Sequence, residues 1–192
     1  MANKVTNILM AGVGGQGILL ASEVLSEVLM LAGYDVKKNE IHGMSQRGGS
    51  VVSHVRFGEK VYSPIIPEGE GDILFGFDLL ESYRYLPLLR KRGKVLVNDL
   101  KILPPSVALG QELYPEDIPG KIARLFPGTK IINGMALALE AGSPRTVNTV
   151  LLGALSQMME IDGNLWQETL RKLVPERYLE ENLKAFELGC RS

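Results

Sequence analysis

Short apolar runs and longer amphipathic segments alternate from the beginning of the chain. Residues 5–11 form an apolar run that opens with a β-branched side chain and stops at Gly12, which is typical of a parallel strand buried on both faces. Apolar side chains then recur at helical spacing between Ile18 and Ala32, and Gly33 is placed to cap a helix. The chain therefore opens with a strand, a glycine-rich turn and a helix.

The next segment predicts an antiparallel hairpin. Residues 34–41 are a polar candidate for the second strand. Residues 51–57 alternate between apolar and polar side chains, and Gly58-Glu59 is expected to turn this strand back into residues 60–63. An antiparallel insertion is therefore expected within an otherwise parallel sheet.

The rest of the chain predicts alternating strands and helices, followed by helices alone. The expected elements are strands at 72–77, 94–98 and 130–133, helices at 79–89, 121–126, 146–159, 165–173 and 178–188, and an irregular proline-rich connection over 104–119. This order predicts an α/β fold: a Rossmann-like three-layer α/β/α sandwich with a mostly parallel sheet, a local β-hairpin insertion and C-terminal helices that cover the sheet.

Composition narrows the class of protein. A chain of 192 residues with 45% hydrophobic content is long enough for one sizeable core, so we expect a single domain over 1–192. With a net charge of -1, the chain lacks the excess of basic residues that is typical of proteins that bind nucleic acid or an anionic membrane. No signal peptide or membrane span is expected, which predicts a cytoplasmic protein. Cys190 is the single cysteine, so thiolates for a disulfide framework, a zinc site or an iron-sulfur cluster are lacking.

The first candidate site is a glycine-rich loop. Its residues fit the Gly-x-Gly-x-x-Gly pattern between a strand and a helix, where backbone N–H groups and a helix N-terminus favour a phosphate. The candidate binding residues are Gly12, Gly14, Gly15, Gln16 and Gly17. A tight turn without a ligand explains the spacing equally well. We also expect Gly14 to lie where a side chain would block the turn between strand and helix.

A dinucleotide site requires more than this loop. It also needs an acidic residue about 20 positions later, at the end of the second strand. Asp35 and Glu40 fall near that window, but neither closes an apolar strand. The pattern therefore gives little support to NAD binding.

The second candidate site is a polar loop between the second and third predicted strands. The glycines allow sharp turns, and the single cation with several short donors predicts an anion-binding loop, which would form one rim with the first loop. Its candidate residues are Ser45, Gln46, Arg47, Gly48, Gly49 and Ser50. A solvated turn with an incidental arginine is the alternative. Arg47 is expected to be exposed and to contact an anion or an acidic partner.

Candidate catalytic groups are scarce. His42 and His54 have no acidic or cysteine partners at ligand spacing, so structural roles are favoured for both. We expect neither a catalytic residue nor a metal ligand in this chain, and no Walker lysine or nucleophile elbow occurs. Gly153, Ala154 and Ser156 indicate close helix packing, inside the chain or at a subunit contact.

Three stretches together resemble a known family. They are Gly12 to Gly17, the run from Gly43 to Arg56, and Tyr62 to Gly69. On these the chain resembles the small subunit of indolepyruvate:ferredoxin oxidoreductases and, more broadly, the gamma subunit or domain of pyruvate and other 2-oxoacid:ferredoxin oxidoreductases. Ser50 stands where the broader family usually has threonine, and with Ser45-Gln46 this favours the indolepyruvate branch.

The resemblance implies a multi-subunit enzyme that converts a 2-oxoacid to an acyl-CoA. Thiamine diphosphate, Mg and the iron-sulfur clusters would belong to a large catalytic partner subunit, which would pass electrons to ferredoxin. This chain would bind no cofactor alone, and its loops would position CoA or close the active site. Aryl pyruvates are the implied substrates, while branched-chain and simple 2-oxoacids stay open.

Two other classes of function remain open at this point. A free-standing Rossmann-type protein would use the first loop for NAD or FAD. A structural adaptor would bind no ligand at either loop. Tight dinucleotide binding by the isolated chain would favour the first.

Overall fold

The computed structural model describes residues 5–43 and 49–192. Its strands are β1 (Thr6–Val13), β2 (Asp35–His42), β3 (Ser50–Gly58), β4 (Gly71–Gly76), β5 (Leu89–Asn98) and β6 (Lys130–Ile132). Its α-helices are α1 (Ile18–Leu31), α2 (Leu79–Tyr85), α3 (Pro105–Ala108), α4 (Ile118–Leu125), α5 (Gly134–Ala141), α6 (Val147–Ser156), α7 (Gly163–Leu173) and α8 (Leu179–Cys190), and short 3-10 turns lie at Leu86–Leu88, Pro144–Thr146 and Glu176–Tyr178. No helix in these ranges is long and apolar enough to cross a membrane.

The strands form one mixed sheet in the order β2-β3-β1-β4-β5-β6. β1, β4, β5 and β6 run parallel, whereas β3 is antiparallel to both of its neighbours. The expected mostly parallel sheet with an antiparallel insertion is confirmed.

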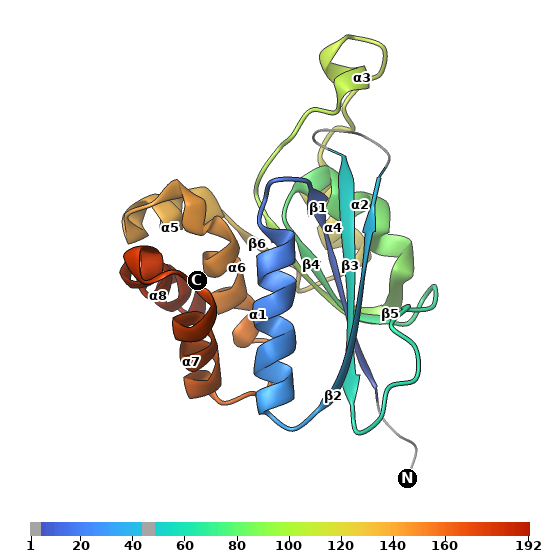
Figure 1. Cartoon of the computed structure of the whole chain (residues 1–192). Coiled ribbons are helices and arrows are strands. Elements are labelled where there is room, and N and C mark those ends of the chain that lie inside the picture. Colours follow the sequence, from blue (N-terminus) through green and yellow to red (C-terminus); the bar gives the residue numbers. More distant parts are fainter. Residues whose placement is uncertain (1–4, 44–48) are drawn as a thin grey trace.

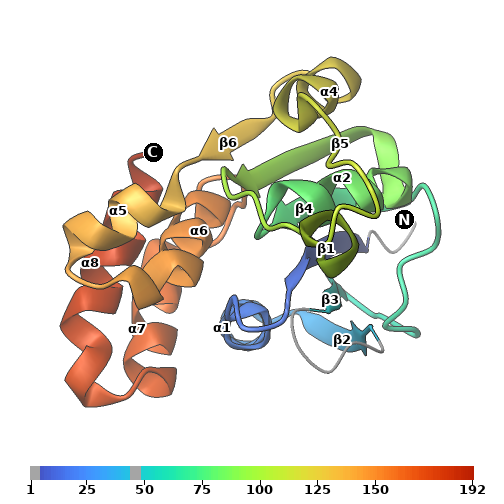
Figure 2. The same ribbon diagram turned by 90° about the horizontal axis from the view of Figure 1, so that it is seen from above.

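Helices cover both faces of the sheet, which confirms the three-layer arrangement. Along β1, Ile8 and Met10 point into the core under α1, α6, α7 and α8, while Leu9 and Ala11 point into the core under α2 and α4. Figure 1 shows α1 and the C-terminal helices on one side of the strands, and Figure 2 shows the same layers from above. The period of two in a strand buried on both faces produces these two cores.

The hairpin lies elsewhere than the sequence pattern predicted. β3 was correctly expected, but it pairs with β2 and β1, and residues 60–63 form no strand. The backbone N–H of Val61 instead donates to the carboxylate of Asp35 at 2.9 Å. The polar segment 35–42 is an edge strand, where polar side chains are tolerated because one side of the strand has no neighbour.

Other differences concern helix ends and two helices that were missed, the short α3 within the connection 104–119 and α5. The predicted helix 79–89 ends at Tyr85, and Pro87 lies in a 3-10 turn before β5 begins at Leu89. α5 was not predicted, because it begins at Gly134, and a glycine in a sequence usually indicates the end of a helix. The C-terminal cap of α1 was predicted correctly: Gly33 has a φ of 89°, and the N–H of Tyr34 donates to the carbonyl of Leu29 at 3.1 Å.

Two glycines let α6 and α8 cross closely. A Cβ placed on Gly153 would collide with the carbonyl oxygen of Phe186, and one on Gly189 would collide with the carbonyl oxygen of Val150. The small residues of α6 therefore serve packing inside the chain, the first of the two roles expected for them. This crossing fixes α6, whose first turn borders the site described next.

Candidate functional site

A cleft of about 330 Å³ opens at the carboxyl edge of the parallel strands. This edge is where open α/β sheets usually bind ligands. The cleft is lined by the turn after β1, the ends of β4 and β5, and the first turns of α5 and α6; its residues are Gly15, Gln16, Gly17, Phe77, Asn98, Asp99, Leu100, Met135, Pro144, Arg145, Val147 and Asn148.

The glycine loop forms one wall of this cleft, and its geometry requires glycine at particular positions. Gly15 and Gly17 have φ angles of 97° and 78°, which side chains disfavour. A Cβ on Gly17 would also lie 2.7 Å from Nδ2 of Asn148, and one on Gly12 would lie 2.7 Å from Cβ of Phe77. Gly14 has neither constraint, since its nearest neighbour would be the carbonyl oxygen of Gly49 at 3.8 Å. The prediction that Gly14 is the sterically critical position is therefore wrong.

Gln16 shapes the loop from within. Its Oε1 accepts a hydrogen bond from the N–H of Val13 at 2.6 Å, and its Nε2 donates to the carbonyl of Phe77 at 3.1 Å. Asn98 donates to the same carbonyl at 3.2 Å and accepts from the N–H of Gly134 at 3.0 Å. These bonds join the ends of β1, β4 and β5 to the start of α5. The floor of the cleft is thus formed before any ligand arrives.

The start of α1 supplies donors beside this floor. Gly17 is its N-cap residue and no side chain caps the helix. The first hydrogen bond of the helix runs from the N–H of Ala21 to the carbonyl of Gly17 at 3.0 Å. The amides of residues 18–20 therefore have no partner within the helix, and such an end attracts an anion.

Arg145 supplies a positive charge on the opposite wall. The side chain is exposed, and it forms no ion pair with any residue in the described parts of the chain. Asp99 lines the same cleft. Sequence analysis missed Arg145, because an arginine in a Ser-Pro-Arg-Thr segment carries no signal until the fold brings it to the first glycine loop.

The second predicted loop is described only at its end. Gly49 lies beside the first loop, where its carbonyl accepts from the N–H of Gly14 at 3.0 Å. Ser50 opposes Val13 in the sheet, and its hydroxyl lies 3.3 Å from that of Tyr85. Ser45, Gln46, Arg47 and Gly48 lie outside the described residues. The two loops therefore adjoin at Gly49, as expected for one rim.

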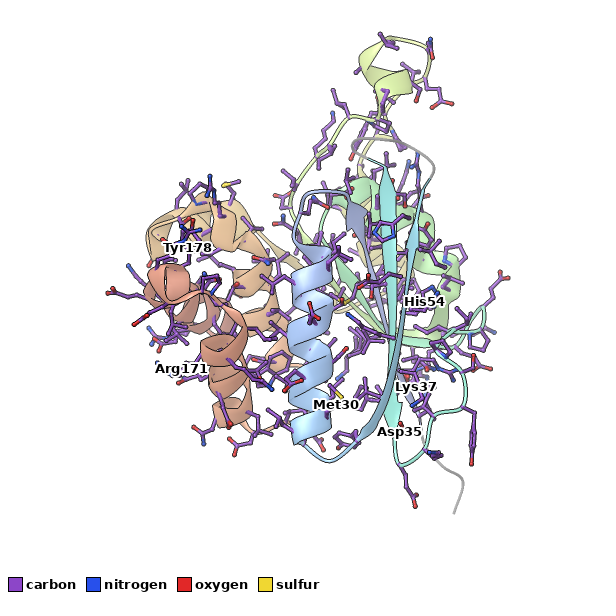
Figure 3. The ribbon with its side chains drawn as sticks, in the orientation of Figure 1. Met30, Asp35, Lys37, His54, Arg171 and Tyr178 are labelled. Atoms are coloured by element: carbon purple, nitrogen blue, oxygen red, sulfur yellow. The ribbon has the colours of Figure 1, made fainter. Side chains whose placement is uncertain are left out.

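The acidic residues near the dinucleotide window do not reach the cleft. β3 separates β1 from β2, so β2 lies at the edge of the sheet and not beside the glycine loop. Glu40 accepts a hydrogen bond from Ser22 at 2.9 Å. Asp35 lies at the start of β2 near Lys37 (Figure 3), and its carboxylate forms an ion pair with the ammonium of Lys37 at 2.9 Å. The reading of the chain as a free-standing Rossmann-type nucleotide-binding protein is not supported.

His54 has the structural environment expected for it. The side chain is buried in β3, and its Nδ1 accepts a hydrogen bond from the N–H of Ile66 at 3.0 Å. Burial, and then the charge of Arg56, lowers the pKa of His54 below its ordinary value. A neutral imidazole that accepts a backbone hydrogen bond holds a loop in place. His42 is exposed at the end of β2.

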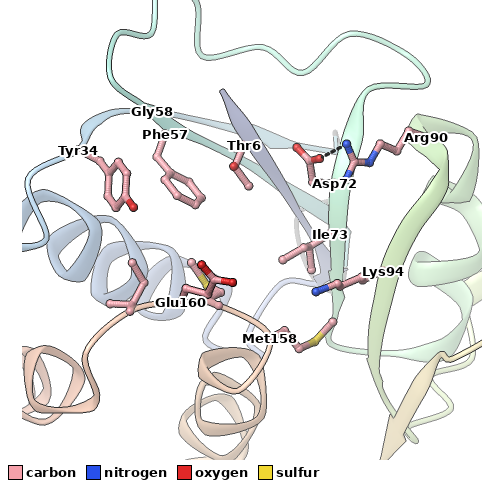
Figure 4. A pocket seen from close by; sticks show the side chains of 12 residues that line it. Thr6, Tyr34, Phe57, Gly58, Asp72, Ile73, Arg90, Lys94, Met158 and Glu160 are labelled. Atoms are coloured by element: carbon pink, nitrogen blue, oxygen red, sulfur yellow. Dashed lines mark ion pairs between the residues drawn. The ribbon is translucent and has the colours of Figure 1, made fainter. Parts of the chain in front are cut away.

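A larger cleft of about 380 Å³ lies at the other end of the sheet. Figure 4 shows its lining, which includes Thr6, Tyr34, Lys94 and Met158. There Arg90 is already paired with Asp72 at 2.8 Å. Because this is the amino edge of the parallel strands, away from the glycine loop, we take the smaller cleft as the candidate site.

The fold is shared with solved structures of 2-oxoacid:ferredoxin oxidoreductases. The keto/oxoacid ferredoxin oxidoreductase gamma subunit of Geobacter sulfurreducens superimposes with a TM-score of 0.72 over 97% of this chain and 96% of its own, at 24% identity. A 2-oxoglutarate:ferredoxin oxidoreductase from Magnetococcus marinus, solved with 2-oxoglutarate, coenzyme A and succinyl-CoA bound, matches with a TM-score of 0.74 over 98% of this chain and 31% of its own, at 24% identity. These identities show a shared fold.

Sequence comparison specifies the family. The chain belongs to the pyruvate ferredoxin/flavodoxin oxidoreductase family, whose pattern matches residues 7–192. It is 41% identical to indolepyruvate oxidoreductase subunit IorB of Pyrococcus horikoshii, over 98% of this chain and 96% of that protein. It is 42% identical, with the same coverage, to the subunit of the same name from Thermococcus kodakarensis.

Proposed function

We propose that this chain is the small, non-catalytic subunit of a 2-oxoacid:ferredoxin oxidoreductase complex, with indolepyruvate and other aryl pyruvates as the substrate class. The observation that carries the proposal is the 41% identity to an indolepyruvate oxidoreductase subunit over nearly the full length of both chains. The whole of 1–192 acts as one gamma-type domain in this assignment.

The chemistry of the donor groups supports a division of labour between subunits. Cys190 is the single cysteine of the sequence, and the described residues contain no group of three His, Cys, Asp or Glu side chains that could hold a metal. Iron-sulfur clusters need several thiolates. We therefore assign thiamine diphosphate, Mg, the clusters and electron transfer to ferredoxin to a larger catalytic partner.

The first test measures the activity of the isolated chain. We expect no reduction of a viologen dye by the purified chain with indolepyruvate, CoA and added thiamine diphosphate, and activity only after the larger subunit is supplied. Turnover by the chain alone would refute the proposed division of labour.

The cleft beside the glycine loop is suited to the phosphates of CoA. The uncapped start of α1, the turn that Gly12 and Gly17 permit, and the exposed guanidinium of Arg145 surround it. Backbone amides and an arginine are the usual phosphate ligands in proteins. We propose that Gly15 and Gly17 bind the anion through their backbone N–H groups, that Gly12 and Gly14 give the loop its turn, that Gln16 holds the loop, and that Ser45, Gln46, Arg47, Gly48, Gly49 and Ser50 extend the same rim.

The second test compares arginines in the reconstituted complex. Arg145→Ala should raise the apparent CoA constant about tenfold or more, because a charge-assisted hydrogen bond contributes roughly 1.5 to 3 kcal/mol. Arg171→Ala is the matched control, since Arg171 is exposed on α7 (Figure 3) and does not line the cleft. Equal CoA constants for the two variants would remove Arg145 from the site.

Arg47→Ala is measured in the same experiment. A higher CoA constant would place Arg47 at the phosphates, whereas weaker subunit affinity alone would place it at the interface. Wild-type values for turnover, CoA and subunit affinity would make it an ordinary solvated side chain.

A further inference from the structure

A second, smaller cleft lies on the other side of the glycine loop. Its volume is about 180 Å³, and it separates α2 from the segment that follows β5. Asp78, Glu81 and Arg84 line one wall, and Leu103 and Pro104 line the other. This cleft shares no lining residue with the 330 Å³ cleft, although Gly49 and Ser50, which the proposed CoA rim includes, also line it.

Two carboxylates in this cleft are buried without a full set of partners. Asp78 is fully buried, and its Oδ1 accepts a hydrogen bond from the N–H of Glu81 at 3.0 Å while its Oδ2 has no partner. Glu81 is 4% exposed, and its Oε1 accepts from Arg84 at 2.6 Å while its Oε2 has no partner. Buried polar atoms without a hydrogen bond are costly and therefore rare. Oδ2 of Asp78 and Oε2 of Glu81 could therefore each accept a hydrogen bond from a ligand.

The charges around the cleft are unbalanced. Burial, and after it the charge of Glu81, raises the pKa of Asp78 to about 6, while the backbone N–H groups of Glu81 and Leu80 and the charge of Arg84 oppose the shift. The hydroxyl of Tyr114, which does not line the cleft, also lacks a partner, and burial and the charge of Asp78 raise its pKa. Lys101 lies over the ring of Tyr114, 4.4 Å from its centre. The carboxylates of Asp78 and Glu81 thus share the guanidinium of Arg84, and a second cation in the cleft would balance the remaining negative charge.

The outer wall of the cleft is an exposed apolar arm, defined here as residues 101–117. α3 within it has no buried residue, and Figure 1 shows it projecting beyond the edge of the sheet. Leu103, Leu109 and Leu113 in the arm are 48%, 73% and 95% exposed. Of these three, Leu103 borders the buried carboxylates. Large apolar side chains in such a place are typical of a protein interface, where they exclude water from a charged contact.

We propose that the cleft between α2 and the arm receives a basic side chain, an arginine or a lysine, of the larger subunit, with Asp78 and Glu81 as its acceptors. The inference rests on the proposed function, in which this chain assembles with such a subunit. The arm packs over the inserted residue, and Leu103, which lines the cleft, joins the acidic and the apolar contacts into one surface.

The test measures affinity for the larger subunit with variants that remove charge and keep shape. Glu81→Gln and Asp78→Asn should each weaken the complex about tenfold or more at about pH 7.5. Asn preserves the helix cap that Asp78 provides. Asp162→Asn is the matched control, since Asp162 is also an N-cap aspartate but is exposed and lies at the start of α7, outside the arm; it should change the affinity less than about twofold.

Two further measurements separate the inference from the proposed function. Wild-type affinity should fall between about pH 7.5 and pH 5.5, and Asp78→Asn should show a shallower fall, because protonation of Asp78 removes an acceptor charge. Propylguanidinium, titrated into the isolated chain, should shift the carboxyl NMR signals of Asp78 and Glu81. A complex that forms with wild-type affinity in both variants would overturn the inference and leave the proposed function intact. If no complex forms, the proposed function fails, and the absence of propylguanidinium binding would overturn this inference independently.

Discussion

Single residues set the shape of the glycine loop. Only some of its glycines are there because a side chain cannot fit. Gly17 combines a φ of 78° with the closeness of Asn148, whereas Gly14 has open space for a Cβ. The Gly-x-Gly-x-x-Gly pattern alone does not distinguish the two, because the contact of Gly17 comes from α6, far along the chain.

The prediction at this scale compares two alanine variants. Gly17→Ala should lower the free energy of unfolding by about 1 to 3 kcal/mol, because a non-glycine residue with positive φ is strained and its Cβ meets Asn148. Gly14→Ala should change it by less than about 0.5 kcal/mol. Urea denaturation of both variants checks this, and equal losses would contradict the assigned geometry.

Sequence reasoning found the wall of the candidate site that the glycine loop forms, but not the residues of the other elements. The loop from Gly12 to Gly17 stands out because its residues are consecutive and lie between a strand and a helix. Arg145 and Asn98 were missed, because each joins the cleft through tertiary packing and neither has a local pattern. Gln16 was predicted as a binding residue without a specific role for its side chain, and both ends of its amide are bonded within the protein.

The positions of strands were predicted better than the pairing between them. The strand 50–58 was evident from its alternation, yet its hairpin partner was assigned to the wrong side. Alternation specifies which side chains share a face, but it does not specify which strand pairs with which. That choice depends on the whole sheet, where β3 fits between β1 and β2.

The crossing of α6 and α8 gives the prediction at the element scale. Gly153→Ala and Gly189→Ala should each lower stability by about 2 kcal/mol or more, because each new methyl group meets a backbone carbonyl that cannot rotate away. Gly163→Ala, in the first turn of α7, is the control, since nothing lies within 4 Å of its Cβ position. Thermal denaturation of the three variants tests this. Similar melting temperatures for all of them would mean that the helices can separate at no cost.

For the molecule as a whole, two buried groups give stability opposite dependences on pH. Asp78 has a pKa of about 6 in the folded chain, against an ordinary value of 3.8. Between these values the folded chain binds more protons than the unfolded chain, so this group stabilises the fold as pH falls. His54 has a lowered pKa, so the unfolded chain takes up its proton first and stability falls as pH drops below about 6.5.

Asp78→Asn should therefore increase the free energy of unfolding at about pH 7 by roughly 1 to 3 kcal/mol, with the gain disappearing near pH 4. The amide keeps the N-cap bond and carries no buried charge. Urea denaturation at the two pH values, with Asp117→Asn as control, measures the difference. A loss of stability at neutral pH would show that the ionised carboxylate is better satisfied than its surroundings indicate.

His54→Gln removes the group whose effect on stability at low pH is opposite to that of Asp78. Glutamine retains an acceptor for the N–H of Ile66 but does not titrate, so the decline in stability between about pH 6.5 and pH 5 should become shallower. The pH dependence of the unfolding free energy in the two chains checks this. An identical decline in both would assign it to other groups.

The exposed arm also affects how long the chain survives before it finds a partner. A segment with no buried helix residue and large exposed leucines opens easily and fits the active site of a chymotrypsin-like protease. Cleavage near Leu109 or Leu113 should therefore be fast in the free chain and slow once a partner covers the arm. Surplus copies would be degraded first, so that proteolysis would match the amount of this chain to the amount of its partner.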